Sequence, residues 1–238
     1  MNQIISQHGW GLDKSLWDNI KKEFLKNNWY WQDSERGYFK YNSKNPKWKE
    51  NQSKTTIKMA ICHSLGTHLI DPNILHEASH IVLINSFNNF VPNNDRRNYT
   101  IKLLQKMETK ICAAKINQLI NEFLIRSFLP NEINNEFKKK FEDNSMEIKI
   151  PQLLKDFKKL YIENKNKKLF SQNAEILIIK SRNDHIINES SSNDFINLLR
   201  KEQTKIPKVI DIDNQGHILS EVNIFKIIIN WIEPNYVK

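Results

Sequence analysis

The stretch that decides the fold covers residues 56–70 and reads T-I-K-M-A-I-C-H-S-L-G-T-H-L-I. Its apolar run at residues 59–61 is typical of the end of a buried parallel strand. Residues 67–70 predict the start of a helix. A strand, a sharp turn with a serine at its apex and a helix form a nucleophile elbow, usually written G-x-S-x-G. Ser64 is therefore a candidate nucleophile, although the same five residues also fit a turn serine that caps a helix.

Glycine is rare in this chain, and its positions favour the elbow. There are only five glycines, and a chain so poor in glycine is expected to keep it where backbone geometry requires it. Four of them lie in three short motifs that each hold a plausible catalytic group. These motifs are H-G-W-G at residues 8–11, the elbow with Gly66, and the pair Gly216-His217. In the elbow, Cys62 replaces the first glycine.

Length and composition indicate a globular protein. The 238 residues can form one large domain or one domain with an insertion, and 39% of them are hydrophobic. Two cysteines are too few for a disulfide framework, so we expect a reducing cytoplasm. We recognise no signal peptide and no apolar run near the roughly 20 residues that a membrane span needs. The net charge of +9 favours an acidic partner, nucleic acid or a membrane surface, unless it reflects genomic bias toward Asn, Lys and Ile.

The order of the expected elements predicts an α/β fold with a mostly parallel sheet flanked by helices. Strands are expected at residues 3–6, 29–32, 58–61, 80–85, 175–180 and 208–212. Helices are expected at 15–27, at 67–70 with a stop at Asp71-Pro72, at 190–201 and at 221–231. Between them, residues 98–107, 110–128, 132–142 and 152–161 predict four helices without a strand. We therefore expect a core at residues 1–87 and 171–238, interrupted by a helical lid at 88–170.

Three side chains have the order and context of a catalytic triad. A serine hydroxyl needs a general base, and the base needs an acid that orients it. Ser64 is followed by Asp184, in the loop after strand 175–180, and by His217, in the loop after strand 208–212. Serine, acid and histidine occur in this order in α/β-hydrolases. Because ligand sites in such sheets lie at the carboxyl ends of the strands, we expect these three side chains to meet.

The oxyanion of such a reaction needs backbone donors. The Leu65 N–H directly follows the nucleophile and is one candidate. The Trp10 N–H, in the loop after the first strand, is the other, with its indole expected to line an acyl pocket and His8 expected to order the loop. We expect no metal site, because His76 and His80 are predicted to lie on a loop and a strand rather than on one helix face.

The predicted lid carries most of the positive charge. Between Asp95 and Lys168 there are seventeen Lys or Arg residues against ten Asp or Glu residues, a net +7. The densest run is Lys138, Lys139 and Lys140. Solvated helix faces are the usual place for lysine. The alternative is a docking surface for an acidic partner above the elbow.

With these motifs in hand, the chain resembles the α/β-hydrolase family, and within it the pimeloyl-acyl-carrier-protein methyl ester esterases of biotin synthesis. Residues 8–17, H-G-W-G-L-D-K-S-L-W, are similar to that group's opening H-G-W-G-L-x-x-x-x-W. Residues 121–127, N-E-F-L-I-R-S, are similar to a family segment E-R-F-L-x-x-Q that contacts the pimeloyl chain. The resemblance carries substrate contact onto five residues, with Ser127 departing from glutamine: Phe123, Leu124, Ile125, Arg126 and Ser127.

The resemblance implies a serine carboxylesterase that frees the pimeloyl carboxylate from its methyl ester. It implies an acidic acyl-carrier protein as partner and no cofactor, and we expect a cytoplasmic monomer that binds neither nucleic acid nor membrane. The alternatives on the same scaffold are a general carboxylesterase, a thioesterase and a carbon–carbon bond hydrolase. A non-catalytic binding protein is a further alternative, since fold does not imply function.

Overall fold

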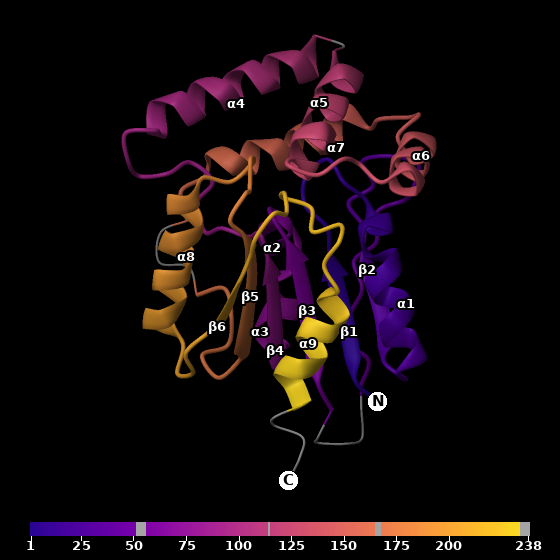
Figure 1. Ribbon diagram of the computed structural model, residues 1–238, viewed down its shortest axis with the longest axis vertical. Helices are drawn as coiled ribbons and strands as arrows, with labels where there is room; N and C mark the ends of the chain where they lie inside the picture. Colours follow the sequence, from indigo (N-terminus) through magenta and orange to yellow (C-terminus); the bar gives the residue numbers. More distant parts are fainter. Residues whose placement is uncertain (51–55, 114, 165–167, 234–238) are drawn as a thin grey trace.

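The computed structural model describes residues 1–50, 56–113, 115–164 and 168–233 of the chain. Within these residues six parallel strands form one sheet in the order β2-β1-β3-β4-β5-β6 (Figure 1). The strands are β1 (Gln3–Gln7), β2 (Tyr30–Ser34), β3 (Lys58–His63), β4 (His80–Ile84), β5 (Glu175–Ser181) and β6 (Lys208–Ile212). Since every pairing is parallel, all six carboxyl ends lie at one edge of the sheet.

Alternate side chains of the strands enter two separate apolar cores, as the period of two requires. Ile4 and Met59 pack in one core with α1 (Asp18–Lys26) and α9 (Ile224–Ile232). Ile5 and Ala60, their neighbours in sequence, pack in the other with α3 (Pro72–Glu77) and α8 (Glu189–Glu202). Helices therefore cover both faces, as parallel sheets need. The predicted α/β class is confirmed.

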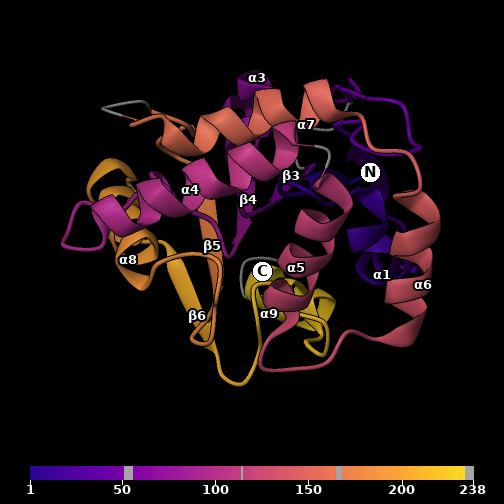
Figure 2. The same ribbon diagram turned by 90° about the horizontal axis from the view of Figure 1, so that it is seen from above.

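Between β4 and β5 the chain forms helices that lie over the carboxyl edge of the sheet (Figures 1 and 2). They are α4 (Arg97–Cys112), α5 (Ile116–Phe128), α6 (Asn135–Asn144), α7 (Ile150–Phe157) and the 3-10 helix η2 (Lys158–Tyr161). We call residues 88–170 the lid segment. Its apolar side chains form a third core with Trp10, Leu12 and Leu65 from the loops below. The exact division of the chain at residues 88 and 170 stays a prediction.

One helix was missed and two sequence-based boundaries were wrong. Asp71-Pro72 does not only stop the short α2 (Gly66–Leu69), because Asp71 accepts a hydrogen bond from Asn73 N and Pro72 begins α3. This geometry is the ordinary N-cap with proline at the first helical position. The break between the helices expected at 98–107 and 110–128 lies later in the chain, because α4 continues to Cys112 and α5 begins at Ile116. The last helix begins at Ile224 rather than residue 221, because the Asn223 side chain caps it.

The other expected helices shift by a few residues. The helix expected at 15–27 is a 3-10 turn, η1 (Lys14–Trp17), followed by α1. That expected at 132–142 begins later, because Asn134 caps α6 through Glu136 N. No helix among the described residues combines the length and the apolar character that crossing a membrane requires.

Candidate active site

Ser64 lies at a strained turn between β3 and α2. Its φ is 55°, in the left-handed region that residues other than glycine rarely adopt. Its backbone N–H donates to Ile84 O at 2.9 Å, which fixes the turn to the end of β4. Such strain collects at functional sites because the surrounding structure must hold it in place. The backbone geometry is that of an elbow rather than of a serine that caps a helix through its side chain, since α2 has no side-chain cap.

The loop after β1 packs directly on this elbow. A Cβ at Gly66 would lie 2.5 Å from Gln7 O and 2.9 Å from His8 O, so only glycine allows α2 to approach β1 this closely. A Cβ at Gly9 would lie 3.0 Å from Ser64 Cβ. Residues 8–11 and the elbow are therefore in contact through their main chains, as the scarcity of glycine predicts.

Asp184 and His217 are brought together as the sequence predicts. His217 Nδ1 lies 2.7 Å from Asp184 Oδ2, and His217 is fully buried while the Asp184 side chain is 9% exposed. Asp184 Oδ1 accepts hydrogen bonds from the N–H groups of Ile186 and Ile187 at 2.7 and 3.0 Å. Burial opposes ionisation of Asp184, but His217 and these N–H groups outweigh it and lower its pKa. An ionised Asp184 requires the proton on His217 Nδ1.

The other ring nitrogen of His217 is left without a partner. Nε2 is buried and has no hydrogen-bond partner among the described residues, so it makes no hydrogen bond with Ser64 Oγ. With the proton on Nδ1, the neutral imidazole presents a lone pair at Nε2. The serine–histidine hydrogen bond of a catalytic triad is therefore not formed in this structure. Such bonds are often long before substrate binds.

The two predicted oxyanion donors lie on the two segments that pack together. Leu65 follows Ser64, and Trp10 follows Gly9, which is in contact with Ser64. Neither backbone N–H donates a hydrogen bond to another residue of the described chain. Both are thus available to a ligand oxygen. Available main-chain donors beside a nucleophile are what stabilisation of a tetrahedral oxyanion requires.

A buried charge pair holds the Trp10 loop. His8 Nε2 lies 3.2 Å from Glu35 Oε1, and both side chains are almost fully buried. Glu35 also accepts hydrogen bonds from Lys14 N at 2.9 Å and Gly37 N at 2.8 Å. Burial alone would lower the pKa of His8, but the Glu35 carboxylate outweighs it and raises this pKa. His8 thus orders the loop, and Glu35, which the sequence analysis did not single out, holds His8.

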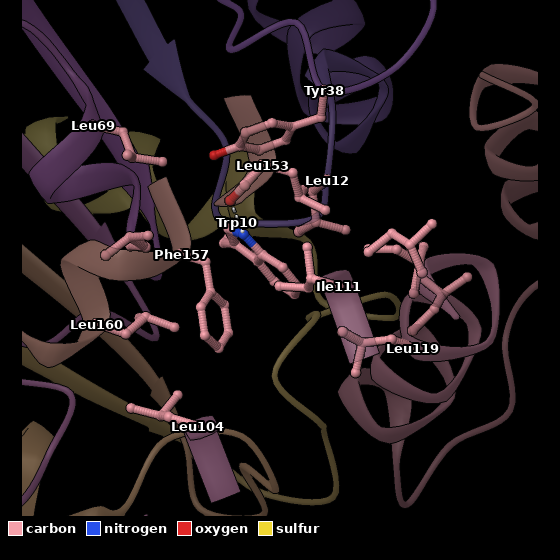
Figure 3. Close-up of a cluster of buried hydrophobic side chains, with 14 of the residues drawn as sticks. Trp10, Leu12, Tyr38, Leu69, Leu104, Ile111, Leu119, Leu153, Phe157 and Leu160 are labelled. Carbon is pink, nitrogen blue, oxygen red and sulfur yellow. Dashed lines mark hydrogen bonds between the residues drawn. The ribbon is translucent and has the colours of Figure 1, made fainter. Parts of the chain in front are cut away.

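The Trp10 indole joins the loop to the lid segment. Its Nε1 donates to Leu153 O at 2.9 Å, and its ring centroid lies 5.2 Å from that of Phe157 (Figure 3). The Phe123 ring packs against it as well, with centroids 5.4 Å apart. The indole is 4% exposed. The surroundings are apolar: Ile111, Leu119, Leu104 and Leu160 belong to the same cluster of buried side chains, and Ile111 lies beside the indole in Figure 3. The indole is thus packed into the lid core, and its contact with an acyl chain stays a prediction.

The predicted substrate contacts at the end of α5 occupy different environments. Phe123 packs on Trp10, Leu124 is buried in the lid core, and Ile125 is 48% exposed. Arg126 Nε donates to His185 O at 2.9 Å, in the loop of Asp184. Ser127 O accepts from Ile218 N at 2.9 Å, beside His217. Phe123 thus faces the Trp10 loop, whereas Arg126 and Ser127 hold the acid and histidine loops. Contact of the five residues with substrate stays a prediction.

The three lysines of the predicted docking run lie on α6 and are exposed. Lys140 Nζ is paired with Asp18 Oδ2 of α1, so it joins the lid segment to the core. Three acidic residues, Glu136, Glu142 and Asp143, lie on the same helix and balance its charge.

The remaining histidines have structural partners or lie apart. His68 Nε2 lies 2.8 Å from Phe87 O, and His76 lies on α3, not on the predicted loop, because α3 was missed. In the described ranges no three His, Cys, Asp or Glu side chains gather as a metal site would.

Comparison with known proteins gives structural matches only. No family model and no curated protein matches the chain. A carboxylesterase of the thaumarchaeon Nitrososphaera gargenis is similar over 98% of this chain and 90% of its own, with a TM-score of 0.68 and 11% identity. A bromoperoxidase from Bacillus anthracis is similar over 98% and 92%, with a TM-score of 0.71 and 15% identity. An esterase from Exiguobacterium antarcticum is similar over 100% and 92%, with a TM-score of 0.67 and 12% identity.

These matches extend over nearly the full length of both chains. Their sequence identities are so low that the matches establish only the fold. The parallel sheet with helices on both faces agrees with them. The protein has the α/β-hydrolase fold.

Proposed function

We propose that the protein is a serine hydrolase that cleaves carboxylic esters, with Ser64, His217 and Asp184 as its catalytic residues. The proposal rests on a single observation, the 2.7 Å hydrogen bond between His217 Nδ1 and Asp184 Oδ2, which leaves His217 Nε2 without a partner. The strained backbone of Ser64 agrees with its role as the nucleophile. Support for this class comes from two structural neighbours, a carboxylesterase from Nitrososphaera gargenis and an esterase from Exiguobacterium antarcticum.

The mechanism follows from the proton positions. His217 Nε2 takes the proton of Ser64 as Oγ attacks the ester carbonyl, and the N–H groups of Trp10 and Leu65 stabilise the oxyanion. The imidazolium then protonates the departing alcohol, leaving an acyl-serine. In the second half His217 activates a water molecule that releases the acid. Asp184 keeps the Nδ1 proton in place and stabilises the imidazolium throughout.

For the substrate we propose the methyl ester of pimeloyl-acyl-carrier protein, so that methanol leaves and the pimeloyl carboxylate is freed. Support comes from the H-G-W-G-L opening, from the apolar surroundings of Trp10 and from the positive lid segment. An acidic carrier would be attracted to such a surface, an effect expressed mainly in association rate and salt dependence.

Two groups of lysine and arginine can supply this surface. The first is the predicted run Lys138–Lys140 on α6, which is balanced by acidic neighbours. The second is on α4 and its N-cap residue, Arg96. Arg96 is exposed, as are Lys102 and Lys106 of the helix, and the helix holds a single acidic residue, Glu108. Arg97 and Lys110 of the same helix are paired with Glu163 and Glu122.

The proposal is tested with purified protein and two substrates, the carrier-linked methyl ester and p-nitrophenyl acetate. Charge reversal to Glu of Lys138, Lys139 and Lys140, or of Arg96, Lys102 and Lys106, is expected to raise KM for the carrier ester only. Added salt should act on the wild type in the same way. Equal effects on both substrates would contradict a docking role.

A growth test asks whether the protein acts in biotin synthesis. The gene should restore biotin-independent growth to a strain that lacks its pimeloyl methyl ester esterase, and Ser64→Ala should not. Failure to restore growth, together with fast turnover of simple esters, would favour a general carboxylesterase, the second candidate. That candidate is favoured by the apolar wall around Trp10, which any simple acyl chain could contact.

A further inference from the structure

His217 is fully buried although it lies in a segment without regular secondary structure between β6 and α9. Two side chains hold its main chain. Asn85 Nδ2 donates to His217 O at 2.8 Å, and His63 Nε2 lies 2.9 Å from the same oxygen. Both are almost fully buried, and neither has a role in the mechanism above. A carbonyl that accepts two hydrogen bonds in the interior is fixed in direction as well as in position.

Asn85 uses both ends of its amide and joins three loops. It follows β4, whose last residue, Ile84, accepts from Ser64 N. Its Oδ1 accepts from Ser181 N at 2.7 Å, at the start of the Asp184 loop, while its Nδ2 reaches the His217 loop. One end must therefore accept and the other must donate, which an amide can do and an ionised carboxylate cannot.

The backbone of Asn85 is also unusual. Its φ is 42°, so two successive strands of the sheet, β3 and β4, are each followed directly by a residue other than glycine with positive φ: Ser64 and Asn85. Asparagine tolerates this region better than most residues. The strained turn directs the amide of Asn85 across the carboxyl edge of the sheet toward β5 and the His217 loop.

His63 completes the arrangement from the other side. Because its Nε2 faces a carbonyl oxygen, Nε2 must carry a proton. Its Nδ1 is buried without a partner, and burial lowers the pKa of His63, so the ring is neutral. Its ring packs against the His217 ring, with centroids 4.6 Å apart. His217 is thus held at its carbonyl by Asn85 and His63, at Nδ1 by Asp184, and along its ring face by His63.

We propose that Asn85 and His63 are positioning residues that hold the His217 main chain so that Nε2 is presented to Ser64. The inference rests on the proposed function for the role of His217 in catalysis. Without Asn85, the His217 loop loses a direct connection to β4 and, through it, to the elbow. An error of about 1 Å in such a group can cost about 100-fold in rate.

Asn85→Gly is the sharpest variant, because glycine keeps the positive φ and removes only the amide. With p-nitrophenyl acetate as substrate, kcat should fall about 10- to 100-fold while KM changes little. The matched control is Asn214→Gly. Asn214 also has a positive φ, 55°, but lies exposed in the His217 loop and takes part through its main chain, which glycine retains. This control should keep wild-type kinetics.

A second pair keeps the test valid if Asn85→Gly folds poorly. His63→Gln retains a donor that can reach His217 O, whereas His63→Leu has none. The rate of His63→Gln should stay within a few-fold of wild type. The rate of His63→Leu should fall about 10-fold or more, which corresponds to the loss of one hydrogen bond. Equal rates in the two variants would overturn the role of His63.

A readout that does not depend on turnover separates this inference from the proposed function. Proton NMR of the Ser64→Ala protein should show a low-field resonance from the His217 Nδ1 proton shared with Asp184. Adding Asn85→Gly should shift or broaden that resonance, and adding Asn214→Gly should not. If the wild type hydrolyses no ester but Asn85→Gly changes the resonance in this way, the proposed esterase function is rejected and the positioning role of Asn85 stands. Wild-type kcat and an unchanged resonance in Asn85→Gly would overturn the positioning role.

Discussion

Arg36 and Asp156 form a two-point ion pair between the loop after β2 and the lid helix α7. Arg36 Nε and Nη2 donate to the two carboxylate oxygens of Asp156 at 2.8 and 2.9 Å. Asp156 is fully buried, and it also accepts from Tyr38 OH and from Gln152 Nε2, both at 2.9 Å. The residue before Arg36 is Glu35, which holds His8. The lid segment and the candidate oxyanion loop are therefore joined through two successive residues.

Asp156→Ala is expected to destabilise the protein strongly. The substitution leaves the Arg36 guanidinium, which is 16% exposed, and the Tyr38 hydroxyl without their acceptor in the interior. Removal of one partner of a buried pair typically costs about 3–5 kcal/mol in the free energy of unfolding. Urea denaturation measures it. As a control, Glu23→Ala removes the exposed Lys26–Glu23 pair and should change stability by roughly 1 kcal/mol or less. Equal losses in the two variants would contradict a special role for Asp156.

His63 should make the protein sensitive to acid. Burial, with a further contribution from His217, lowers the pKa of His63 to about 3. The unfolded chain takes up a proton at His63 near pH 6.5, and the folded protein does not until about pH 3. Between these values the unfolded state binds more protons, so stability falls as the pH falls, by at most about 1.4 kcal/mol per pH unit.

The test compares wild type with His63→Gln by urea denaturation from pH 7 to pH 4. The variant should show a shallower loss of unfolding free energy, because glutamine does not titrate. His76→Gln, which replaces an exposed histidine on α3, serves as the control and should keep the wild-type slope. Parallel curves for wild type and His63→Gln would show that His63 is not buried in its neutral form.

The sequence predicts those features that are encoded locally. The strands follow from short apolar runs, and the elbow from residues 62–66. Asp184 and His217 were found because each directly follows a strand, and strand ends meet at one edge of a parallel sheet. The helix α3 was missed because Asp71-Pro72 fits both a stop signal and the N-cap of a new helix, and only the tertiary path decides between them.

The contacts that support the site could not be predicted in this way. Arg36 and Asp156 are 120 residues apart, and Asn85 and His217 are 132 apart. A single sequence contains no periodic signal for such pairs. The signals available were weak: charged residues just before Gly37, and an asparagine at the end of an apolar strand at residue 85.

The aromatic ring of Trp10 should contribute more to ester hydrolysis than its indole nitrogen does. Trp10→Phe loses the bond to Leu153 O but keeps an aromatic wall against Phe123 and Phe157, so most of the activity should remain. Trp10→Ala leaves a cavity beside the acyl pocket. We expect it to raise KM for esters of longer acyl chains, measured with a series of p-nitrophenyl esters. Wild-type behaviour of Trp10→Ala on every ester would remove Trp10 from the acyl pocket.

Substitutions of the three proposed triad residues should lower kcat to different extents. Ser64→Ala and His217→Ala should each lower kcat by several orders of magnitude, because each removes a group that takes part in the proton transfer. Asp184→Asn should be somewhat less harmful, since Ile186 N and Ile187 N can still hold the loop. Initial rates with p-nitrophenyl acetate measure all three. Full activity in any of them would exclude that residue from the triad.

Labelling with a fluorophosphonate, followed by peptide mass spectrometry, tests the central claim most directly. The reagent forms a covalent bond only with a serine that a general base activates, and it needs no knowledge of the natural substrate. We predict one label, on Ser64, in the wild-type protein, and none on Ser64→Ala or His217→Ala. A label on another residue, or a folded wild-type protein that takes up no label, would contradict the assignment of Ser64, His217 and Asp184 as a catalytic triad.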